Sequence, residues 1–433
     1  MDKTVHPIER IIAEYKSGKH TGIFSNCSAN EYVLRAVMRR CKAHGIPALI
    51  EATANQVDQD GGYTGMTPAM FFKWCHELAE REEFDQTQLI LGGDHLGPLT
   101  WTKLNESEAM EKAQKLIGEY VSAGFTKIHI DTSMRLASDD HIKPLSDEVI
   151  AGRGAKLCLA AEAAYTERND KIPDAVKPLY IIGSEVPIPG GSQEHEELSV
   201  TSKESCLATI TAFKTAFAEA GLNEAWERVI AVVVQPGVEF SEDEVFVYNS
   251  EKAKNLCSVI KSDEFVFEGH STDYQPRPAM KELVNDGIII LKVGPALTFA
   301  LREALFALEN IEKVIYSGCN KALSKFTEVL DRVMLEKPDQ WIKHYHGDEH
   351  KQKINRAYGF SDRVRYYLPE PVVKDSITRL VSNLNKPIPL PLLSQFMPIQ
   401  YMRVRDGTLI NNVDDLILDR IGDCIDDYIF AIE

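Results

Sequence analysis

Three histidines lie at the ends of short apolar runs, where they could bind a metal ion. His95 ends LILGGDH, His129 lies in KIHIDTS and His270 ends FVFEGH. Imidazole is the commonest metal ligand near neutral pH, and carboxylates complete such sites. We predict that His95, His270 and either Glu239 or Glu185 bind a divalent metal ion. The alternative is that these histidines are hydrogen-bonded packing residues.

Two aspartates beside these histidines could transfer protons. Asp94 precedes His95, and Asp131 comes shortly after His129 in HIDTS. A carboxylate next to a metal ion can act as a general base or orient a substrate hydroxyl. Adjacent strand residues point to opposite faces, so Asp94 and His95 share one face only if the chain has already turned. We predict Asp94, Asp131 and Glu185 as catalytic residues, with a helix or turn cap as the alternative role of Asp131.

Further polar residues follow the same apolar runs and would surround a substrate. Each run is followed by acids, amides or imidazoles, a set that no hydrophobic core needs. The predicted substrate-binding residues are Ser25, Asn26, Glu51, Asn55, Gln56, His129, Gln235, Glu268, Asp273 and Lys292.

A phosphate group could bind where the last apolar run passes into a helix. KVGPALT, which starts at Lys292, opens that helix. Helix N-termini after strands seven and eight are the usual phosphate site of a barrel. We predict that Gly294 and Thr298, together with Ser271 and Thr272, bind a phosphate. An ordinary strand-to-helix turn would have a similar sequence.

Eight apolar runs, alternating with amphipathic helical stretches, would position these residues. The predicted strands lie in TGIFSNCS, ALIEATANQ, LILGGDHLGP, KIHIDTS, YIIGSEVP, VIAVVVQPG, FVFEGHSTD and IIILKVGP. Near-continuous Val, Ile and Leu runs are typical of parallel strands buried on both faces. Asn105 and Ser146 are predicted helix caps. Eight such repeats favour a (β/α)₈ TIM barrel, over residues 1–310, with its site at the C-terminal strand ends.

Residues 311–433 lack this alternation and are predicted to form a mainly helical C-terminal extension packed on the barrel. Within it, SDRVRYYLP is expected to pack against the barrel mouth or a neighbouring subunit, or to form a helix with a basic outer face. HYHGDEH has histidines at metal-like spacing, but its hydrophilic surroundings predict an exposed loop.

Composition argues against several classes of protein. The net charge of −17 over 433 residues argues against nucleic-acid binding, which needs clustered Lys and Arg. No apolar run is long enough for a membrane helix, and neither GxxxxGK[ST] nor GxGxxG occurs. The first residues lack the apolar stretch of a signal peptide, and no cysteines are spaced C-x-x-C. We therefore expect a cytoplasmic protein that contacts neither nucleic acid nor membrane.

Several long motifs resemble one protein family. They are EATANQVDQDGGYTGMTP, LGGDHLGP, KIHIDTS, GSEVPIPGG, VVVQPGVEF, FEGHSTDYQ and LKVGPALTFALREA. They are similar, nearly end to end and including SDRVRYY, to the Z-type (GatZ/KbaZ) subunit of bacterial D-tagatose-1,6-bisphosphate aldolase. The resemblance implies a ketohexose phosphate substrate, a role in galactitol or N-acetylgalactosamine catabolism, and a separate catalytic class II aldolase subunit as a partner. We also expect a homo-oligomer.

The chain also resembles, more distantly, the class II metal-dependent aldolases. The similar segments are Asp94-His95, Ile130-Asp131-Thr132-Ser133, His270 and Lys292-Val293-Gly294. The resemblance implies a base and a metal ligand in the first pair and a metal ligand at His270. The strand-six metal histidine of these aldolases has no counterpart, because that segment runs from Gln235 to Glu239 as QPGVE. Glu239 or Glu185 would then complete the site, and the ion could be Zn, Co, Ni, Mn or Mg.

Three functions follow from the resemblance. The first is a metal-dependent 4-epimerase that interconverts D-tagatose 6-phosphate and D-fructose 6-phosphate. In a 2-ketose the carbonyl acidifies C3 but not C4, so inversion at C4 is easier by breaking and remaking the C3–C4 bond than by deprotonation. The second is a non-catalytic subunit that stabilises a separate aldolase. The third is a tagatose-6-phosphate kinase.

Overall fold

Eight parallel strands form a closed barrel, which confirms the predicted (β/α)₈ fold. The computed structural model describes residues 5–140, 142–185, 199–260 and 265–433. The barrel strands are β1 (Ile23–Asn26), β2 (Ala48–Thr53), β3 (Leu89–Leu96), β4 (Lys127–Ile130), β5 (Leu179–Ile182), β6 (Val229–Val234), β9 (Val266–Gly269) and β10 (Ile288–Val293). Their order around the barrel is β1-β10-β9-β6-β5-β4-β3-β2. Each strand overlaps one of the eight predicted runs.

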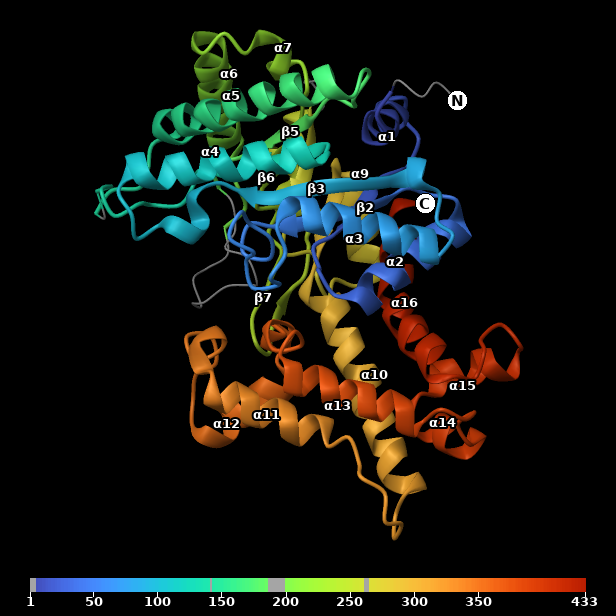
Figure 1. Cartoon of the computed structure of the whole chain (residues 1–433). Coiled ribbons are helices and arrows are strands. Elements are labelled where there is room, and N and C mark those ends of the chain that lie inside the picture. The colour runs from blue at the N-terminus through green and yellow to red at the C-terminus, as the bar shows by residue number, and fades with distance from the viewer. Residues whose placement is uncertain (1–4, 141, 186–198, 261–264) are drawn as a thin grey trace.

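Helices surround the strands on the outside of the barrel (Figure 1). They are α2 (Glu31–His44), α3 (Pro68–Arg81), α4 (Glu106–Ala123), α5 (Asp147–Lys171), α6 (Lys203–Glu219), α7 (Asn223–Trp226), α8 (Ser250–Cys257) and α9 (Arg277–Asn285). Because helices cover the strands, β6 is buried along its whole length, as its VIAVVV sequence predicts. Asn105 caps α4 by accepting from the Glu108 N–H at 3.0 Å, and Ser146 caps α5 by accepting from the Val149 N–H at 3.4 Å, which confirms both caps.

The first helix covers the N-terminal ends of the strands. α1 (Pro7–Lys16) buries Ile8 and Ile12. Next to it, a ring nitrogen of His6 lies 3.0 Å from the hydroxyl of Thr126, the residue before β4. This end of the barrel is therefore covered, and the opposite end is left for a site.

The last helix returns to the barrel after a long excursion. α10 (Pro295–Ile315) leads away from β10 into a lower group of helices (Figure 1). That group is α11 (Phe326–Glu336), α12 (Glu349–Tyr358), α13 (Pro371–Asn383), α14 (Leu390–Phe396) and α15 (Pro398–Arg405). α16 (Val413–Ile432) then packs against α2, α9 and α10 and contacts β1. α16 thus fills the place on the outside of the barrel, beside β1 and β10, that α10 does not fill. The domain boundary near residue 310 stays a prediction.

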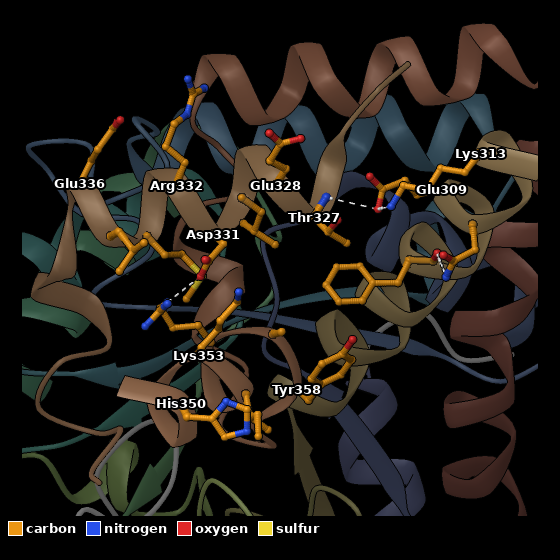
Figure 2. A pocket seen from close by; sticks show the side chains of 18 residues that line it. Glu309, Lys313, Thr327, Glu328, Asp331, Arg332, Glu336, His350, Lys353 and Tyr358 are labelled. Carbon is orange, nitrogen blue, oxygen red and sulfur yellow. Dashed lines mark hydrogen bonds and ion pairs between the residues drawn. The ribbon is translucent and has the colours of Figure 1, made fainter. Parts of the chain in front are cut away.

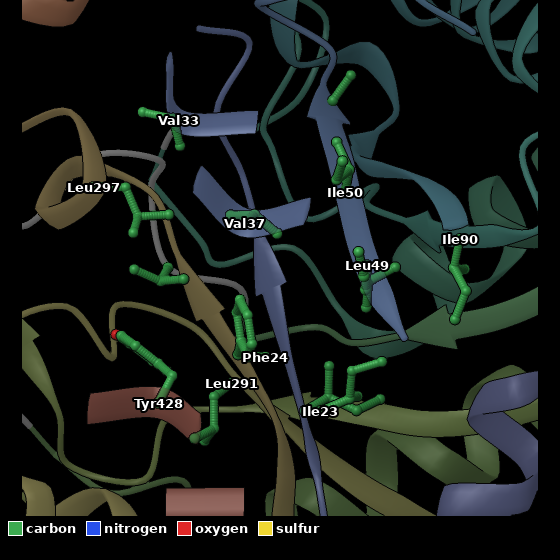
Figure 3. Close-up of a cluster of buried hydrophobic side chains, with 14 of the residues drawn as sticks. Ile23, Phe24, Val33, Val37, Leu49, Ile50, Ile90, Leu291, Leu297 and Tyr428 are labelled. Carbon is green, nitrogen blue, oxygen red and sulfur yellow. The ribbon is translucent and has the colours of Figure 1, made fainter. Parts of the chain in front are cut away.

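The hydrophobic core between β1, β2, β10 and their helices joins both ends of the chain. Figure 3 shows Phe24 of β1, Val37 of α2, Leu291 of β10 and Tyr428 of α16 in this buried cluster. The rings of Phe24 and Tyr428 are 5.9 Å apart, and the Tyr428 hydroxyl donates to the backbone oxygen of Thr272 at 2.8 Å. α16 is therefore held by polar as well as apolar contacts.

The structure also bears on the expectations about membrane-spanning segments and cysteine spacing. Among the described residues, no helix is both long and apolar enough to cross a membrane. All eight cysteines are free thiols, and five of them are buried.

Candidate functional site

Asp94 and His95 both face the barrel mouth because the chain turns at the end of β3. His95 has a left-handed backbone, with φ of 49°, and the pairing with β4 shifts register between Gly93 and Leu96. The His95 N–H donates to Asp94 Oδ1 at 3.1 Å, and both side chains line one cavity. The chain has therefore already turned at Asp94 and His95, as the sequence analysis required for both side chains to face the same side.

Three imidazole rings meet at the mouth. The ring centres of His95 and His270 are 5.0 Å apart, and that of His129 is 5.2 Å from each of the other two. His129 comes from β4, and His270 follows β9. The barrel closure thus joins side chains that are far apart in the sequence.

Four residues offer ligand atoms that all lie within 4.8 Å of one another: Asp94, His129, Glu268 and His270. All four are buried. His129 Nδ1 lies 2.8 Å from Asp94 Oδ1 and 3.2 Å from the backbone nitrogen of His95, while Nε2 of the same ring is buried and has no hydrogen-bond partner among the described residues. Burial lowers the pKa of His270 to about 4, although Glu268 and Asp94 oppose this, so its ring is neutral at pH 7. Neutral imidazole is the form that binds metal ions.

Two buried lysines share the carboxylates beneath this cluster. Lys127 Nζ lies 2.7 Å from a Glu51 oxygen and 2.5 Å from a Glu268 oxygen. Lys292 Nζ lies 2.9 Å from Glu51 and 3.0 Å from Asp94. Burial alone would lower the pKa of Lys292, but Asp94 and the other nearby anions hold it well above its usual value. Both lysines are thus part of an ionic network inside the barrel.

The charges of this network fit a bound cation. Three buried carboxylates, those of Asp94, Glu51 and Glu268, face the ammonium groups of Lys127 and Lys292. The Asp131 carboxylate instead pairs with His95; burial would lower the pKa of that histidine, but Asp94 and Asp131 raise it. Burial favours protonation of Asp94, yet Lys292 and the nearby histidines hold its pKa well below the usual range, so it is ionised. A bound cation would offset the negative charge that the two lysines leave unbalanced. The donor atoms and the charge balance therefore suit a metal ion.

Many of the predicted residues do meet at the mouth. Those that line the cavity are Asn55, Gln56, Asp94, His95, His270, Ser271, Asp273, Lys292 and Gly294. Ser25 lies below it and donates to Glu51 at 2.5 Å. Asn26 is fully buried, and its amide has no hydrogen-bond partner among the described residues. Asn26 is not among the residues that line the cavity.

Other predicted residues lie apart from the cluster or are already bonded. Glu185 is exposed and accepts from the Ser205 hydroxyl at 2.6 Å. Glu239 is buried but is not among the four clustered residues. Gln235 accepts from two backbone N–H groups of its own turn. Asp131 contacts His95 Nδ1 at 2.8 Å and also accepts from the backbone and hydroxyl of Ser133, so it both caps a turn and orients an imidazole.

The predicted phosphate site is occupied by a side chain. Asp273 accepts from the N–H groups of Gly294 (3.1 Å) and Ala296 (2.8 Å) at the start of α10. Burial raises the pKa of Asp273 to about 6. The hydroxyl of Thr298 donates to Asp362, and that of Thr272 donates to the Lys292 carbonyl at 2.7 Å. A phosphate at this position would have to compete with the Asp273 carboxylate.

Four residues that contribute to the site were not predicted to bind substrate or metal. Lys127 was overlooked, although a lysine inside the apolar run KIHI is a visible signal. Tyr63 comes from the loop after β2. Arg365 and Tyr366 come from a 3₁₀ turn of the extension (Arg363–Tyr366) and line the cavity, which agrees with the expectation that SDRVRYYLP packs against the barrel mouth.

The histidines of HYHGDEH are not a metal cluster among the described residues. Arg363 donates to His344, whereas His346 is exposed. His350 lines a separate groove between α10, α11 and α12, which Figure 2 shows together with Glu309 and Lys353. This groove belongs to the extension and not to the barrel mouth.

Comparison with known proteins gives one family. The model of the D-tagatose-1,6-bisphosphate aldolase subunit GatZ/KbaZ-like family matches residues 8–433. The crystal structure of a probable tagatose 6 phosphate kinase from Sinorhizobium meliloti 1021 is 42% identical, with a TM-score of 0.85, and the match covers 95% of this chain and 100% of that one. A putative fructose-1,6-biphosphate aldolase from Coccidioides immitis matches at 12% identity and a TM-score of 0.44, over 87% of this chain and 98% of that one. The last similarity is too low to bear on activity.

Proposed function

This chain belongs to the GatZ/KbaZ-like family of D-tagatose-1,6-bisphosphate aldolase subunits, and from that premise we propose that it is a metal-dependent D-tagatose 6-phosphate/D-fructose 6-phosphate 4-epimerase. The observation that carries the proposal is the buried cluster of Asp94, His129, Glu268 and His270 at the barrel mouth. A purely stabilising subunit has no need to keep an unpaired imidazole nitrogen and a buried ionic network at that position. Such groups cost stability unless they serve a ligand.

We propose that His129, His270 and Glu268 hold the ion. The two histidines come from different strands, His129 from β4 and His270 from the end of β9. Nδ1 of His129 is already bonded to Asp94, which leaves Nε2 for the ion. This pairing of a carboxylate with a ligand histidine is the usual support of a metal site. His95 and Glu239, which the sequence analysis includes among the ligands, remain candidates for completing the site. When bound, the ion would act as a Lewis acid that polarises the ketose carbonyl.

Asp94 is the proposed proton acceptor. Its Oδ1 atom is bonded to His129 and Lys292, whereas Oδ2, among the described residues, has the Cys27 thiol at 3.6 Å and His95 Nε2 at 3.7 Å. Oδ2 is therefore the oxygen available to a sugar hydroxyl. It removes the proton from O4, the C3–C4 bond breaks, and the electrons move to the C2 carbonyl to give an enediolate.

Inversion follows when the released aldehyde turns before the bond forms again. C3 of the enediolate attacks the other face of the aldehyde, the C2 carbonyl is restored, and O4 takes up a proton. An aldolase shares the first half of this sequence but releases the aldehyde. The exclusion of water by a buried site favours recombination over release.

A second candidate function is a stabilising subunit of a separate aldolase. The family description as an aldolase subunit favours it, as does the lack of a histidine between Gln235 and Glu239. In that case the polar residues at the barrel mouth would stabilise the fold or contact the partner subunit. The kinase description belongs to the Sinorhizobium relative.

One experiment separates these functions. The purified chain is incubated with D-tagatose 6-phosphate, without metal and with Mg²⁺, Mn²⁺, Co²⁺, Ni²⁺ or Zn²⁺, and D-fructose 6-phosphate is measured. We expect conversion with at least one metal and none after chelation. No conversion with any of the metals would refute the epimerase. Rescue of an aldolase partner without turnover would support the stabilising subunit, and ATP-dependent formation of a bisphosphate would support a kinase.

A further inference from the structure

One tyrosine of the extension has an unusual environment at the barrel mouth. Arg363 Nη1 and Arg365 Nη2 each lie 3.2 Å from the Tyr366 hydroxyl oxygen and donate to it. Tyr366 and Arg365 line the same cavity as Asp94. Two guanidinium groups thus converge on the phenol oxygen of a residue that lines the cavity.

Neither arginine has a carboxylate partner within salt-bridge distance among the described residues. The other bonds of Arg365 go to the backbone oxygens of Ser361 and Asp362. The Asp362 carboxyl accepts from Thr298 and lies 3.5 Å from Arg302, so it acts on Arg365 only from beyond salt-bridge distance. Burial also raises the pKa of Asp362. Buried positive charge without a counter-ion is costly, and a phenolate between the two guanidinium groups would supply the missing negative charge.

The other groups around Tyr366 do not supply that charge. Arg363 donates to His344, and burial, together with Arg363, lowers the pKa of His344 to about 3, so its ring is neutral. Tyr63 packs edge-on against Tyr366 with ring centres 4.9 Å apart, and burial raises its pKa. Asp273, the other acid near Arg365, is bonded to the start of α10.

The Tyr366 hydroxyl also finds no acceptor for its own proton among the described residues, where it is bonded only as an acceptor. Burial would raise the pKa of Tyr366, but Arg365 and then Arg363 lower it by more, so the pKa falls below its usual value. A phenol that accepts two charged donors and lacks an acceptor is set to exchange its proton with a group in the cavity.

We propose that Tyr366 is the second proton-transfer group of this site and exchanges a proton with O4 of the sugar opposite Asp94. The proposal rests on the 4-epimerase function proposed above. Inversion at C4 turns O4 from one side of the sugar to the other, so one carboxylate on β3 is poorly placed for both alcohols. Asp94 belongs to β3 of the barrel and Tyr366 to a 3₁₀ turn of the extension, and both residues line the same cavity.

The proton balance is simple. In one direction Asp94 takes the proton from O4 before the C3–C4 bond breaks. After C3 has attacked the other face of the aldehyde, the O4 alkoxide takes the phenolic proton of Tyr366, which becomes a phenolate between its two arginines. Exchange with solvent removes the proton from Asp94 and returns one to Tyr366. In the reverse direction the Tyr366 phenolate accepts and the protonated Asp94 donates.

The test compares Tyr366→Phe with Tyr358→Phe, the same loss of a hydroxyl from an exposed tyrosine of the extension that does not line the cavity. For Tyr366→Phe we expect the epimerisation kcat to fall by roughly 100-fold. The ratio of trapped three-carbon aldehyde phosphate to epimer should rise, because cleavage by Asp94 is retained while O4 of the inverted product is not protonated. Tyr358→Phe should keep both kcat and that ratio close to those of the wild type.

A titration gives a readout that does not need turnover. The ultraviolet absorbance of tyrosinate in the wild type minus that in Tyr366→Phe should show a phenol that ionises below pH about 10. Arg365→Gln should move this step to higher pH. An unchanged kcat and aldehyde ratio in Tyr366→Phe, or no such ionisation in the wild type, would overturn this inference and leave the epimerase intact. An inactive wild-type chain would instead refute the epimerase, and the proposed role of Tyr366 with it.

Discussion

His129 Nδ1 lies 2.8 Å from Asp94 Oδ1, and Nε2 of the same ring has no partner among the described residues. Because Asp94 is ionised, its oxygen favours the tautomer in which Nδ1 carries the proton, and the Nε2 lone pair is then left for another partner. A histidine held in this way by a carboxylate is prepared to bind a metal ion. The pair therefore links the two proposed roles of the site, metal binding and proton transfer.

Removal of a clustered imidazole should reduce metal binding. We expect His129→Ala and His270→Ala each to weaken metal affinity by more than about tenfold, a loss that even an outer partner of a ligand can cause. Bound metal is measured by mass spectrometry after dialysis and by calorimetric titration. The exposed His346, changed to alanine, is the control and should bind as the wild type does. Full metal binding by both barrel variants would show that the cluster is not a metal site.

Loss of the Asp94 carboxylate should stop proton transfer without removing its hydrogen-bonding oxygen. For Asp94→Asn we expect kcat to fall by roughly 10²- to 10⁴-fold, the usual contribution of a general base. The assay is conversion of D-tagatose 6-phosphate under saturating metal, so that weaker metal binding does not limit the rate. Asp60→Asn, on the exposed surface, is the control. A fall of less than about tenfold would assign the base to another residue.

Glu239 should make the metal-free protein less stable as the pH rises. Burial raises its pKa to about 7 in the folded chain, against a usual value of about 4.3 in the unfolded chain. The unfolded chain therefore loses this proton first, and stability falls between pH about 4.5 and pH about 7. The Glu239→Gln variant does not carry this titrating group. Its stability relative to the wild type should therefore be up to about 3 kcal/mol greater at pH 8 than at pH 5.

Urea unfolding at both pH values, with a chelator present, measures this difference. Glu224→Gln, on the exposed surface of α7, should show no such dependence. If the wild type and Glu239→Gln lose stability in parallel from pH 5 to pH 8, the Glu239 carboxyl is not protonated in the folded chain.

The return of α16 to the barrel should contribute to global stability. The Tyr428 hydroxyl bonds the Thr272 carbonyl, next to the strand end that carries His270. For Tyr428→Phe we expect a loss of about 1 kcal/mol, and for Tyr428→Ala a loss of about 3–5 kcal/mol, because a buried ring leaves a cavity. Both are read from urea midpoints. Tyr358→Phe is the control, since that side chain is 60% exposed. An unchanged midpoint for Tyr428→Ala would mean that α16 is not part of the cooperative fold.

The proposed ligand set illustrates the limit of reading residues along the strands. His270 and Asp94 were predicted as site residues from their positions at strand ends, and the structure places both in the cluster. His129 and Glu268 were predicted to bind substrate, yet both belong to the four clustered residues that could hold a metal ion. The sequence gives each residue a strand and a face but not its distance to side chains of other strands, which depends on register and on the local turn at His95.

The number and order of the strands, and the end of the barrel at which polar groups gather, followed from the sequence alone. Apolar runs and helix caps are local signals, and β/α alternation leaves few topologies. Which polar groups meet was decided by the tertiary structure. Asp273 fills the start of α10, Lys127 enters the carboxylate network, and Tyr366 reaches the mouth from the extension. Such contacts join residues far apart in the chain, and they form only when the barrel closes and the extension packs against it.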